Sequence, residues 1–221
     1  MARPRSEEKR SAILEAATLV FDQEGISAPT ARIARQAGVA EGSLFTKFET
    51  KDELLNALYL ELKTELRDAR MPGYPLTESR RSRARHAWRG FVAWGVAHPH
   101  KRQVINVLGL SERVTEASKT AGMLAFEALN AMLAEAAQAG PMRGQPLAFV
   151  GRLMTSMAEA TMDFIERAPA DAELFQDAGF EAFWRAVGGD AVPAVSPLVD
   201  KARRQGKSAA AGSRALKAKP G

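Results

Sequence analysis

The amino-acid sequence predicts an all-α protein. Apolar residues recur at the helical spacing of three to four positions along most of the chain, as Ile13, Ala17 and Val20 do near its start. The alternation of apolar and polar residues that is typical of strands is nearly absent. Clusters of Gly and Pro separate the periodic segments. With 221 residues, the chain is long enough to bury a core in one or two domains.

Three helices are predicted within the first fifty residues. The first begins at about Ser6, where two acidic residues follow and suit the positive end of the helix dipole, and it ends at Gly25. A short second helix is predicted over 30–37, and Gly38 interrupts it. A third short helix follows and extends to about Phe48.

A fourth helix follows directly and is predicted to end near Arg70. Thr50 and Glu53 have the spacing of a capping box, in which each side chain accepts a hydrogen bond from the backbone N–H of the other residue. Leucines at helical spacing continue after this cap. The segment 71–75 contains two prolines and a glycine, and it therefore predicts a joint between two domains.

The remainder of the chain is predicted to contain five more helices and a tail. Apolar residues at helical spacing place these helices over about 84–95, 104–108, 114–139, 146–167 and 171–187. From Gly189 onward the chain is rich in Ala, Gly, Pro, Ser and basic residues. Such a segment has too little apolar bulk to offset the entropy that ordering costs, so we expect disorder there.

Charge and composition exclude several classes of protein. The net charge is +5, but seven of the 31 basic residues lie in 201–221, which has no acidic residue, and the rest of the chain has 24 basic against 26 acidic residues. The basic excess thus reports mainly on the tail. The absence of cysteine excludes disulfides, thiolate metal sites and cysteine nucleophiles. No membrane-spanning stretch or secretory signal is recognisable, so a cytoplasmic protein is expected.

The segment 28–54 predicts a helix-turn-helix motif. Two short helices flank a turn at Gly38, where glycine permits a sharp change of direction. The small residues Ala34 and Ala37 allow the helices to approach closely. In such motifs the second helix lies in the major groove of DNA with its N-terminal residues at the base edges. Double-stranded DNA is therefore the predicted partner.

At these residues the sequence resembles the tetracycline-repressor (TetR) family of bacterial transcription regulators. The resemblance covers about residues 8–60 and depends on an ordered set of short motifs rather than on any one of them. These motifs are Thr30, Ile33-Ala34, Ala37-Gly38-Val39, Gly42-Ser43-Leu44-Phe45-Thr46-Lys47-Phe48, and Lys51 ahead of Leu54-Leu55.

The resemblance implies a set of DNA contacts. Thr30 and Lys51 would contact phosphates at the starts of the second and fourth helices. Phe45 belongs to the same set, although the family commonly has Tyr there, whose hydroxyl reaches a phosphate; Phe45 keeps the packing and lacks that bond. Taken singly, each residue has an alternative: Thr30 is an N-cap of the second helix, and Lys51 is an ordinary solvated lysine. The residues implied to face the groove are Glu41, Gly42, Ser43, Thr46 and Lys47.

The same resemblance implies a homodimer. The last two predicted helices would pack against those of a second copy as a four-helix bundle, and the alternative is that their apolar faces form the core of one chain. The residues on these faces are Val150, Leu153, Met154, Met157, Thr161, Phe164, Ile165, Phe180, Phe183, Trp184 and Val187.

A small-molecule effector in the second domain is implied as well. Its identity is open, and the aromatic and methionine side chains favour an apolar or aromatic ligand. An ordinary place in the core is the alternative for each of these side chains. The residues predicted to line the site are Trp88, Phe91, Trp94, Met123, Phe126, Met154 and Met157.

Three further features of the sequence concern its histidines, a basic run and the N-terminal arginines. His98 and His100 lack the spacing of a helical metal pair, and no cofactor motif or catalytic constellation is present, so no metal, cofactor or catalytic residue is predicted. The basic run 80–85 is interpreted as a solvated face, with a second DNA-facing surface as the alternative. Arg3 and Arg5 belong to a frayed terminus or form an arm that reaches a DNA groove.

The predicted organisation is a DNA-binding domain over 1–51, a connecting helix over 52–70, a ligand-binding and dimerisation domain over 71–190, and a basic tail over 191–221. The predicted function is that of a dimeric repressor, released from a pseudo-palindromic operator when a small molecule tilts the connecting helix. One alternative is a ligand-independent architectural DNA binder of low specificity that uses the basic tail. The other, a helical enzyme that keeps the motif as a relic, has no acid–base pair or nucleophile to support it, so the chain is not expected to be an enzyme.

Overall fold

The computed structural model describes residues 5–188, and within them the backbone forms ten α-helices and no strand. The predicted all-α class is therefore confirmed. The basic tail and Arg3 lie outside the described residues, and so does the side chain of Arg5.

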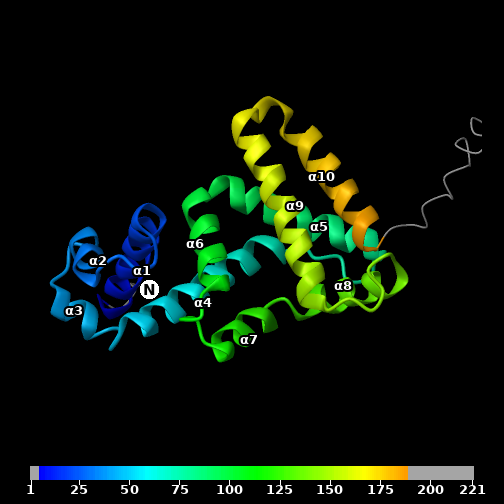
Figure 1. The fold of residues 1–221 in the computed structure, drawn as a ribbon. Coiled ribbons are helices and arrows are strands. Elements are labelled where there is room, and N and C mark those ends of the chain that lie inside the picture. The colour runs from blue at the N-terminus through cyan, green and yellow to red at the C-terminus, as the bar shows by residue number, and fades with distance from the viewer. Residues whose placement is uncertain (1–4, 189–221) are drawn as a thin grey trace, which may run out of the picture.

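The first three helices form a small domain at one end of the molecule (Figure 1). They are α1 (Arg5–Glu24), α2 (Thr30–Gln36) and α3 (Glu41–Phe45). The predicted apolar stripe of α1 faces inward, where Ile13 and Ala17 are completely buried with Ile33 of α2 and Leu44 of α3. Phe48, just beyond α3, closes this core at 2% exposed. The third helix is shorter than predicted, since Thr46 already serves as its C-cap.

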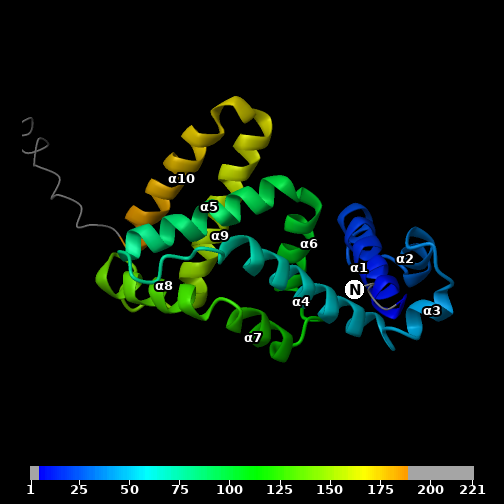
Figure 2. The ribbon, with the colours of Figure 1, turned by 180° about the vertical axis from the view of Figure 1, so that it is seen from behind.

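Helix α4 (Lys51–Arg70) runs from the small domain into the rest of the molecule (Figures 1 and 2). The Thr50 hydroxyl accepts a hydrogen bond from the Glu53 backbone N–H at 3.1 Å, which confirms the predicted N-cap. The second half of the capping box differs, because the Glu53 carboxylate accepts from the backbone N–H of Glu49 at 2.7 Å rather than from that of Thr50. Both bonds satisfy free donors at the start of the helix.

The remaining helices form a larger domain around the C-terminal half of α4. Helices α9 and α10 lie side by side and run in opposite directions across a short 3₁₀ turn (Figure 1). The bounds of these elements are α5 (Arg80–Ala97), α6 (Pro99–Leu110), α7 (Glu116–Leu124), α8 (Glu127–Ala139), α9 (Leu147–Arg167), η1 (Pro169–Asp171) and α10 (Ala172–Val187).

The prediction of one long helix over 114–139 is wrong, because the helix is interrupted between α7 and α8. Phe126 has φ −121° and ψ 26°, outside the helical region, and its side chain is 4% exposed. Its ring lies beside α4, with the centroid 5.8 Å from the Lys63 ammonium and 5.4 Å from the Arg70 guanidinium. In α7, Gly122 lets the helix approach Tyr59 and Lys63 of α4 so closely that a Cβ would clash. The break thus allows α7 to pack against α4 while Phe126 is buried.

The apolar face predicted for the last helix belongs to the core of one chain. Phe180, Phe183, Trp184 and Val187 are all at most 4% exposed, and Phe183 stacks on Trp88 with 5.6 Å between ring centroids. These four side chains are therefore not available to a second copy, which corrects their assignment to a dimer face. The large apolar side chains that α9 and α10 do expose are Phe149, Phe164 and Leu174.

The basic run at the start of α5 is neither a solvated face nor an open DNA-binding surface. Arg81 and Arg85 pair with Glu181 of α10, each at 2.6 Å, and Arg85 also reaches Asp177 at 3.0 Å. Arg83 lies 3.8 Å from the carboxylate of Glu135 on α8. The run therefore ties α5 to α8 and α10.

Two polar contacts tie the small domain and the start of α4 to the large domain. His100 at the start of α6 contacts Asp22 of α1, with 2.5 Å between Nδ1 and Oδ2, and Arg113 pairs with Asp52 of α4 at 2.5 Å. Helices α4 and α6 thus form the connection between the domains. Among the helices of residues 5–188, none combines the length and the apolar character needed to span a lipid bilayer.

Candidate nucleic-acid interface

The turn between α2 and α3 has the sharp geometry that the helix-turn-helix prediction requires. Gly38 has φ +66°, a backbone conformation that favours glycine. On either side of it, Ile33 and Ala34 of α2 and Leu44 of α3 point into the core, with exposures of 0 to 2%. The opposite faces of both short helices are left to solvent.

The outward face of α3 carries the residues that were predicted to face a DNA groove. Glu41, Gly42 and Thr46 are exposed, and Ser43 and Lys47 are half-buried. A Cβ added at Gly42 would meet nothing within 4 Å, so the backbone there is open to close approach. Phe45 is 41% exposed, and its ring is therefore at the surface rather than in the core.

Two of the predicted contact residues bind each other. The Thr30 hydroxyl donates a hydrogen bond to the Glu41 carboxylate at 2.8 Å, and so it links the start of α2 to the start of α3. Thr30 is not the N-cap of α2, because Pro29 holds that position without a side-chain cap. The Thr46 hydroxyl donates to the backbone oxygen of Gly42 at 2.8 Å. A DNA phosphate would have to compete with Glu41 for the Thr30 hydroxyl.

A polar hollow lies between the start of α1 and the C-terminal end of α3. It has a volume of about 290 Å³ and is lined by Ser6 and Lys9 together with Ser43, Thr46 and Lys47. The Lys47 ammonium donates to the Ser6 hydroxyl across it. Ser6 and Lys9 were not predicted as site residues; the sequence signal that could have found them is a polar pair three positions apart at the start of the first helix.

Lys51 is engaged inside the small domain. Its ammonium donates to the backbone oxygen of Ala28 at 2.6 Å and lies 5.9 Å from the centroid of the Phe21 ring. Burial, and next the positive charge of Arg113, lower the pKa of Lys51. The lysine that was predicted to contact a phosphate therefore fastens the loop before α2 to the start of α4.

The predicted ligand residues divide into a buried and an exposed group. Trp88, Phe91, Trp94, Phe126 and Met154 are at most 7% exposed, whereas Met123 is 43% exposed and Met157 is half-buried. The structure brings Phe91, Phe126 and Met154 together around one side chain, Arg70 of α4.

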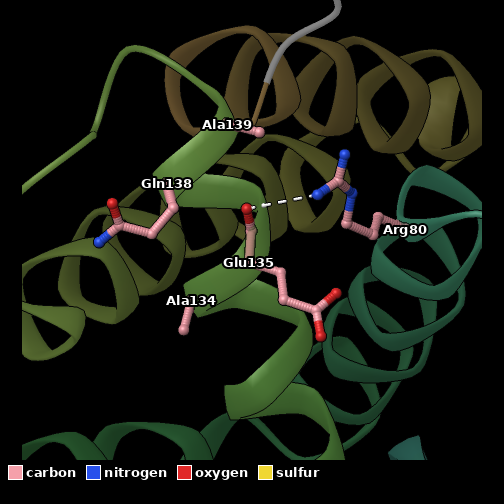
Figure 3. Close-up of a pocket in the computed structure, with 5 residues that line it drawn as sticks. All are labelled: Arg80, Ala134, Glu135, Gln138 and Ala139. Carbon is pink, nitrogen blue, oxygen red and sulfur yellow. Dashed lines mark hydrogen bonds between the residues drawn. The ribbon is translucent and has the colours of Figure 1, made fainter.

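None of these seven residues lines the hollow that opens between α5 and α8 (Figure 3). That hollow has a volume of about 550 Å³ and is lined by Arg80, Ala134, Glu135, Gln138 and Ala139. Figure 3 shows Arg80 reaching from α5 to the backbone oxygen of Glu135, at 3.4 Å. Within residues 5–188, no three His, Cys, Asp or Glu side chains are grouped so that they could hold a metal ion.

The fold and this surface define the class of the protein: it is a helix-turn-helix protein with a second, helical domain. The comparisons give the family that the N-terminal domain resembles. Residues 13–58 match the model of the bacterial regulatory proteins of the tetR family. The resemblance found in the sequence is thereby confirmed for the N-terminal domain, which matches the DNA-binding part of the tetR-family regulators.

Several solved structures have a similar fold, and the match to this chain extends over nearly the whole length of each of them. A protein of Shewanella sp. PV-4 that is assigned to the tetR family is 26% identical, with a TM-score of 0.72 over 82% of this chain and 99% of that one. A TetR family regulator of Marinobacter aquaeolei VT8 is 19% identical, with a TM-score of 0.71 over 84% and 98%. The regulator FadR of Bacillus subtilis, solved in complex with stearoyl-CoA, is 16% identical, with a TM-score of 0.61 over 80% and 98%. The last two likenesses concern the fold alone.

Proposed function

We propose that the chain is a cytoplasmic homodimeric repressor that a small organic molecule releases from a pseudo-palindromic operator. The observation that carries this proposal is the outward face of α3, where Gly42 is open and Ser43, Thr46 and Lys47 line a polar hollow. A lysine and two hydroxyl groups at the end of a short recognition helix can donate to phosphates and to base edges.

The DNA contacts are proposed in two groups. Ser43, Thr46 and Lys47 read the groove, and Gly42 lets the backbone come close to DNA. Lys9 joins them, because it lines the same hollow and is exposed. Thr30, Glu41, Phe45 and Lys51 flank this group: Glu41 holds Thr30 in place, Phe45 offers an apolar surface, and Lys51 adds positive charge near the phosphates.

A dimer is required by the length of the recognition helix. Helix α3 has five residues and can contact only a few base pairs, so a specific site needs two copies about 34–36 Å apart. The support for an interface lies on α9 and α10, where Phe149, Phe164 and Leu174 are 47 to 66% exposed. All three belong to the same helix pair, and exposed apolar side chains of this kind are common at subunit interfaces.

The release mechanism is proposed to act through α4, which belongs to both domains. A ligand that prefers one tilt of α4 changes the separation of the two recognition helices, and it shifts the equilibrium only by its differential affinity for the two states. Moving a dimer from almost fully bound to almost fully free needs a preference of about 10⁴-fold, or about 5.5 kcal/mol. That FadR was solved with stearoyl-CoA supports a ligand site in this fold.

The experiment that tests the function is selection of bound genomic fragments by the purified full chain near ~150 mM salt, where non-specific binding is weak. The comparison is a Ser43→Ala/Lys47→Ala variant with the same helical content. We expect the wild type to enrich a shared pseudo-palindrome and the variant to lose it. Fragments without a common motif, bound equally by both proteins and lost on deletion of 201–221, would instead establish the architectural binder that uses the basic tail.

A further inference from the structure

The C-terminal end of α4 buries an arginine that has no carboxylate partner. Arg70 is 5% exposed, and its Nε donates to the backbone oxygen of Ala87 at 3.2 Å. The nearest partner of its Nη2 is the sulfur of Met154 at 3.9 Å, and sulfur is a weak acceptor. The rings of Phe91 and Phe126 lie 4.9 and 5.4 Å from the guanidinium carbon. No acidic side chain of residues 5–188 pairs with it.

The surroundings of a second buried arginine show what Arg70 lacks. Arg102 of α6 is 4% exposed, and three carboxylates of α9 surround it, with Glu159, Asp163 and Glu166 at 3.0 to 3.3 Å. A buried charge without such partners is costly, because water no longer solvates it and no counter-ion replaces the water. In keeping with this, burial lowers the pKa of Arg70 to about 10, which leaves it charged at neutral pH.

Two buried donors, on the turn after α4 and on α5, have no hydrogen-bond partner among the described residues. They are the hydroxyl of Tyr74 and Nε of Arg83. Burial raises the pKa of Tyr74, and the positive charges of Arg83 and Arg70 oppose that rise, which places the phenol within the field of both arginines. The acidic side chain nearby is Glu135, which is largely exposed and 3.8 Å from Arg83. Because buried donors are normally paired, this group is expected to have an acceptor.

The side chains around Arg70 are largely apolar. Phe91, Phe126 and Met154 surround Arg70, and one further cation, Lys63, lies two turns earlier on the same face of α4, 5.8 Å from the Phe126 ring. Glu135, which lies 3.8 Å from Arg83, also lines the hollow of Figure 3.

We propose that Arg70, Tyr74 and Arg83 form the anion subsite of the effector domain, and that the effector is an organic acid, a carboxylate or phosphate with an apolar body. The acid group binds Arg70 and accepts from the Tyr74 hydroxyl, while the apolar body lies against the side chains of Phe91 and Met154. This inference rests on the proposed ligand-responsive function and names the class of its ligand. Since the three donors lie on α4, on the turn after it and on α5, a bound acid holds the end of the connecting helix in one position.

The test uses calorimetric titration of the full chain with four probes: decanoate, decyl phosphate, decanol and inorganic phosphate. The first two differ in head group, decanol shares the chain without the charge, and inorganic phosphate lacks the chain. We expect saturable binding of at least one decyl acid and at least about tenfold weaker binding of decanol, since a hydrogen bond to a charged group contributes a factor of that size. Preference between the two decyl acids identifies the head group.

Two variants tie the binding to the subsite. Arg70→Met keeps the volume and removes the charge, and because Arg70 has no carboxylate partner, the variant is expected to fold with undiminished stability. Tyr74→Phe removes a single hydroxyl. We expect Arg70→Met to lose about tenfold or more in affinity for the acid and nothing for decanol, and Tyr74→Phe to lose less. Arg67→Met, at a half-exposed neighbour on α4, is the matched control and should bind like the wild type.

Three results would overturn the inference: decanol binding as tightly as the acids, equal acid affinity in the folded Arg70→Met variant, or no saturable binding of either acid by the folded chain. Selection of DNA fragments with the same protein preparation tests the proposed repressor function independently of the ligand class. Specific DNA binding without acid binding refutes the ligand class alone, whereas acid binding without specific DNA binding refutes the repressor and leaves the subsite.

Discussion

At the scale of single residues, the two glycines of the helix-turn-helix serve different purposes. Gly38 has φ +66°, so it is needed for its backbone conformation. Gly42 lies within α3, and the space around it is empty, so neither backbone conformation nor packing requires glycine there. We attribute Gly42 to function and Gly38 to folding.

This difference predicts opposite effects of the same substitution. Gly38→Ala should lower the free energy of unfolding by about 1–2 kcal/mol, because a Cβ is disfavoured at positive φ. Gly42→Ala should leave stability unchanged or raise it by up to about 1 kcal/mol through helix propensity, and yet weaken binding to the selected operator, since its methyl group would lie on the face that we propose to contact DNA. Urea unfolding and operator titration measure the two effects; full operator affinity in Gly42→Ala would contradict the placement of this face against DNA.

Lys63 predicts a pH dependence of stability. Burial, and next the charge of Arg70, lower its pKa to about 8, below the value of about 10.4 in the unfolded chain. The unfolded state therefore binds more protons between these values, and the free energy of unfolding should rise by about 1–2 kcal/mol between pH ~7.5 and ~9.5. The phenols of Tyr59 and Tyr74 have raised pKa values and stay neutral in this range. Lys63→Met should remove most of the rise in urea unfolding series, because the lowered pKa of Lys51 contributes in the same direction. An equal rise in the variant would assign it to other groups.

At the scale of elements, one arginine holds α6 to α9. Arg102 is buried among three carboxylates, but only its Nη2 bond to Asp163, at 3.0 Å, has hydrogen-bond geometry. Arg102→Met would leave these partly exposed acids facing one another and should lower the free energy of unfolding by about 1–3 kcal/mol. The control is Lys101→Met, at the position just before Arg102, which breaks the half-exposed ion pair between Lys101 and Glu65. This variant should change the free energy of unfolding by less than about 1 kcal/mol. If thermal unfolding showed the same loss of stability in both variants, burial of Arg102 would add nothing to the stability that its ion pairs provide.

Helix ends differ in whether nearby residues or tertiary packing determine them. The start of α4 was predictable because Thr50 and the backbone of Glu53 lie within one turn of each other. The break between α7 and α8 was not, because alanines and other good helix formers continue across it and Phe126 leaves the helix only to be buried against α4. Likewise, Arg81 and Arg85 looked like a solvated run until α10 supplied Glu181, about a hundred positions away.

At the scale of the whole molecule, the proposed dimer predicts a matched pair of variants. Leu174 on α10 and Leu110 at the end of α6 are both 66% exposed, and only Leu174 lies on the proposed α9–α10 face. Leu174→Asp should shift the chain from dimer to monomer and weaken operator binding, because a charge buried in an interface is costly. Leu110→Asp should remain dimeric. Sedimentation velocity measures both, and a dimer that tolerates Leu174→Asp would place the interface elsewhere.

The sequence by itself determined the all-α class, the helix-turn-helix and the tetR-family resemblance of the N-terminal domain, and it supplied the residues that we propose to contact DNA, because each of these depends on spacings within a few dozen positions. The tertiary structure alone decided how these residues are engaged: that Thr30 binds Glu41, that Lys51 is tied to Ala28, and that Lys9 joins the hollow at α3. It also decided that Arg70 is buried without a carboxylate. Spacing along a helix fixes which side of it a residue occupies, whereas the partner on that side comes from another element, and only packing brings the two together.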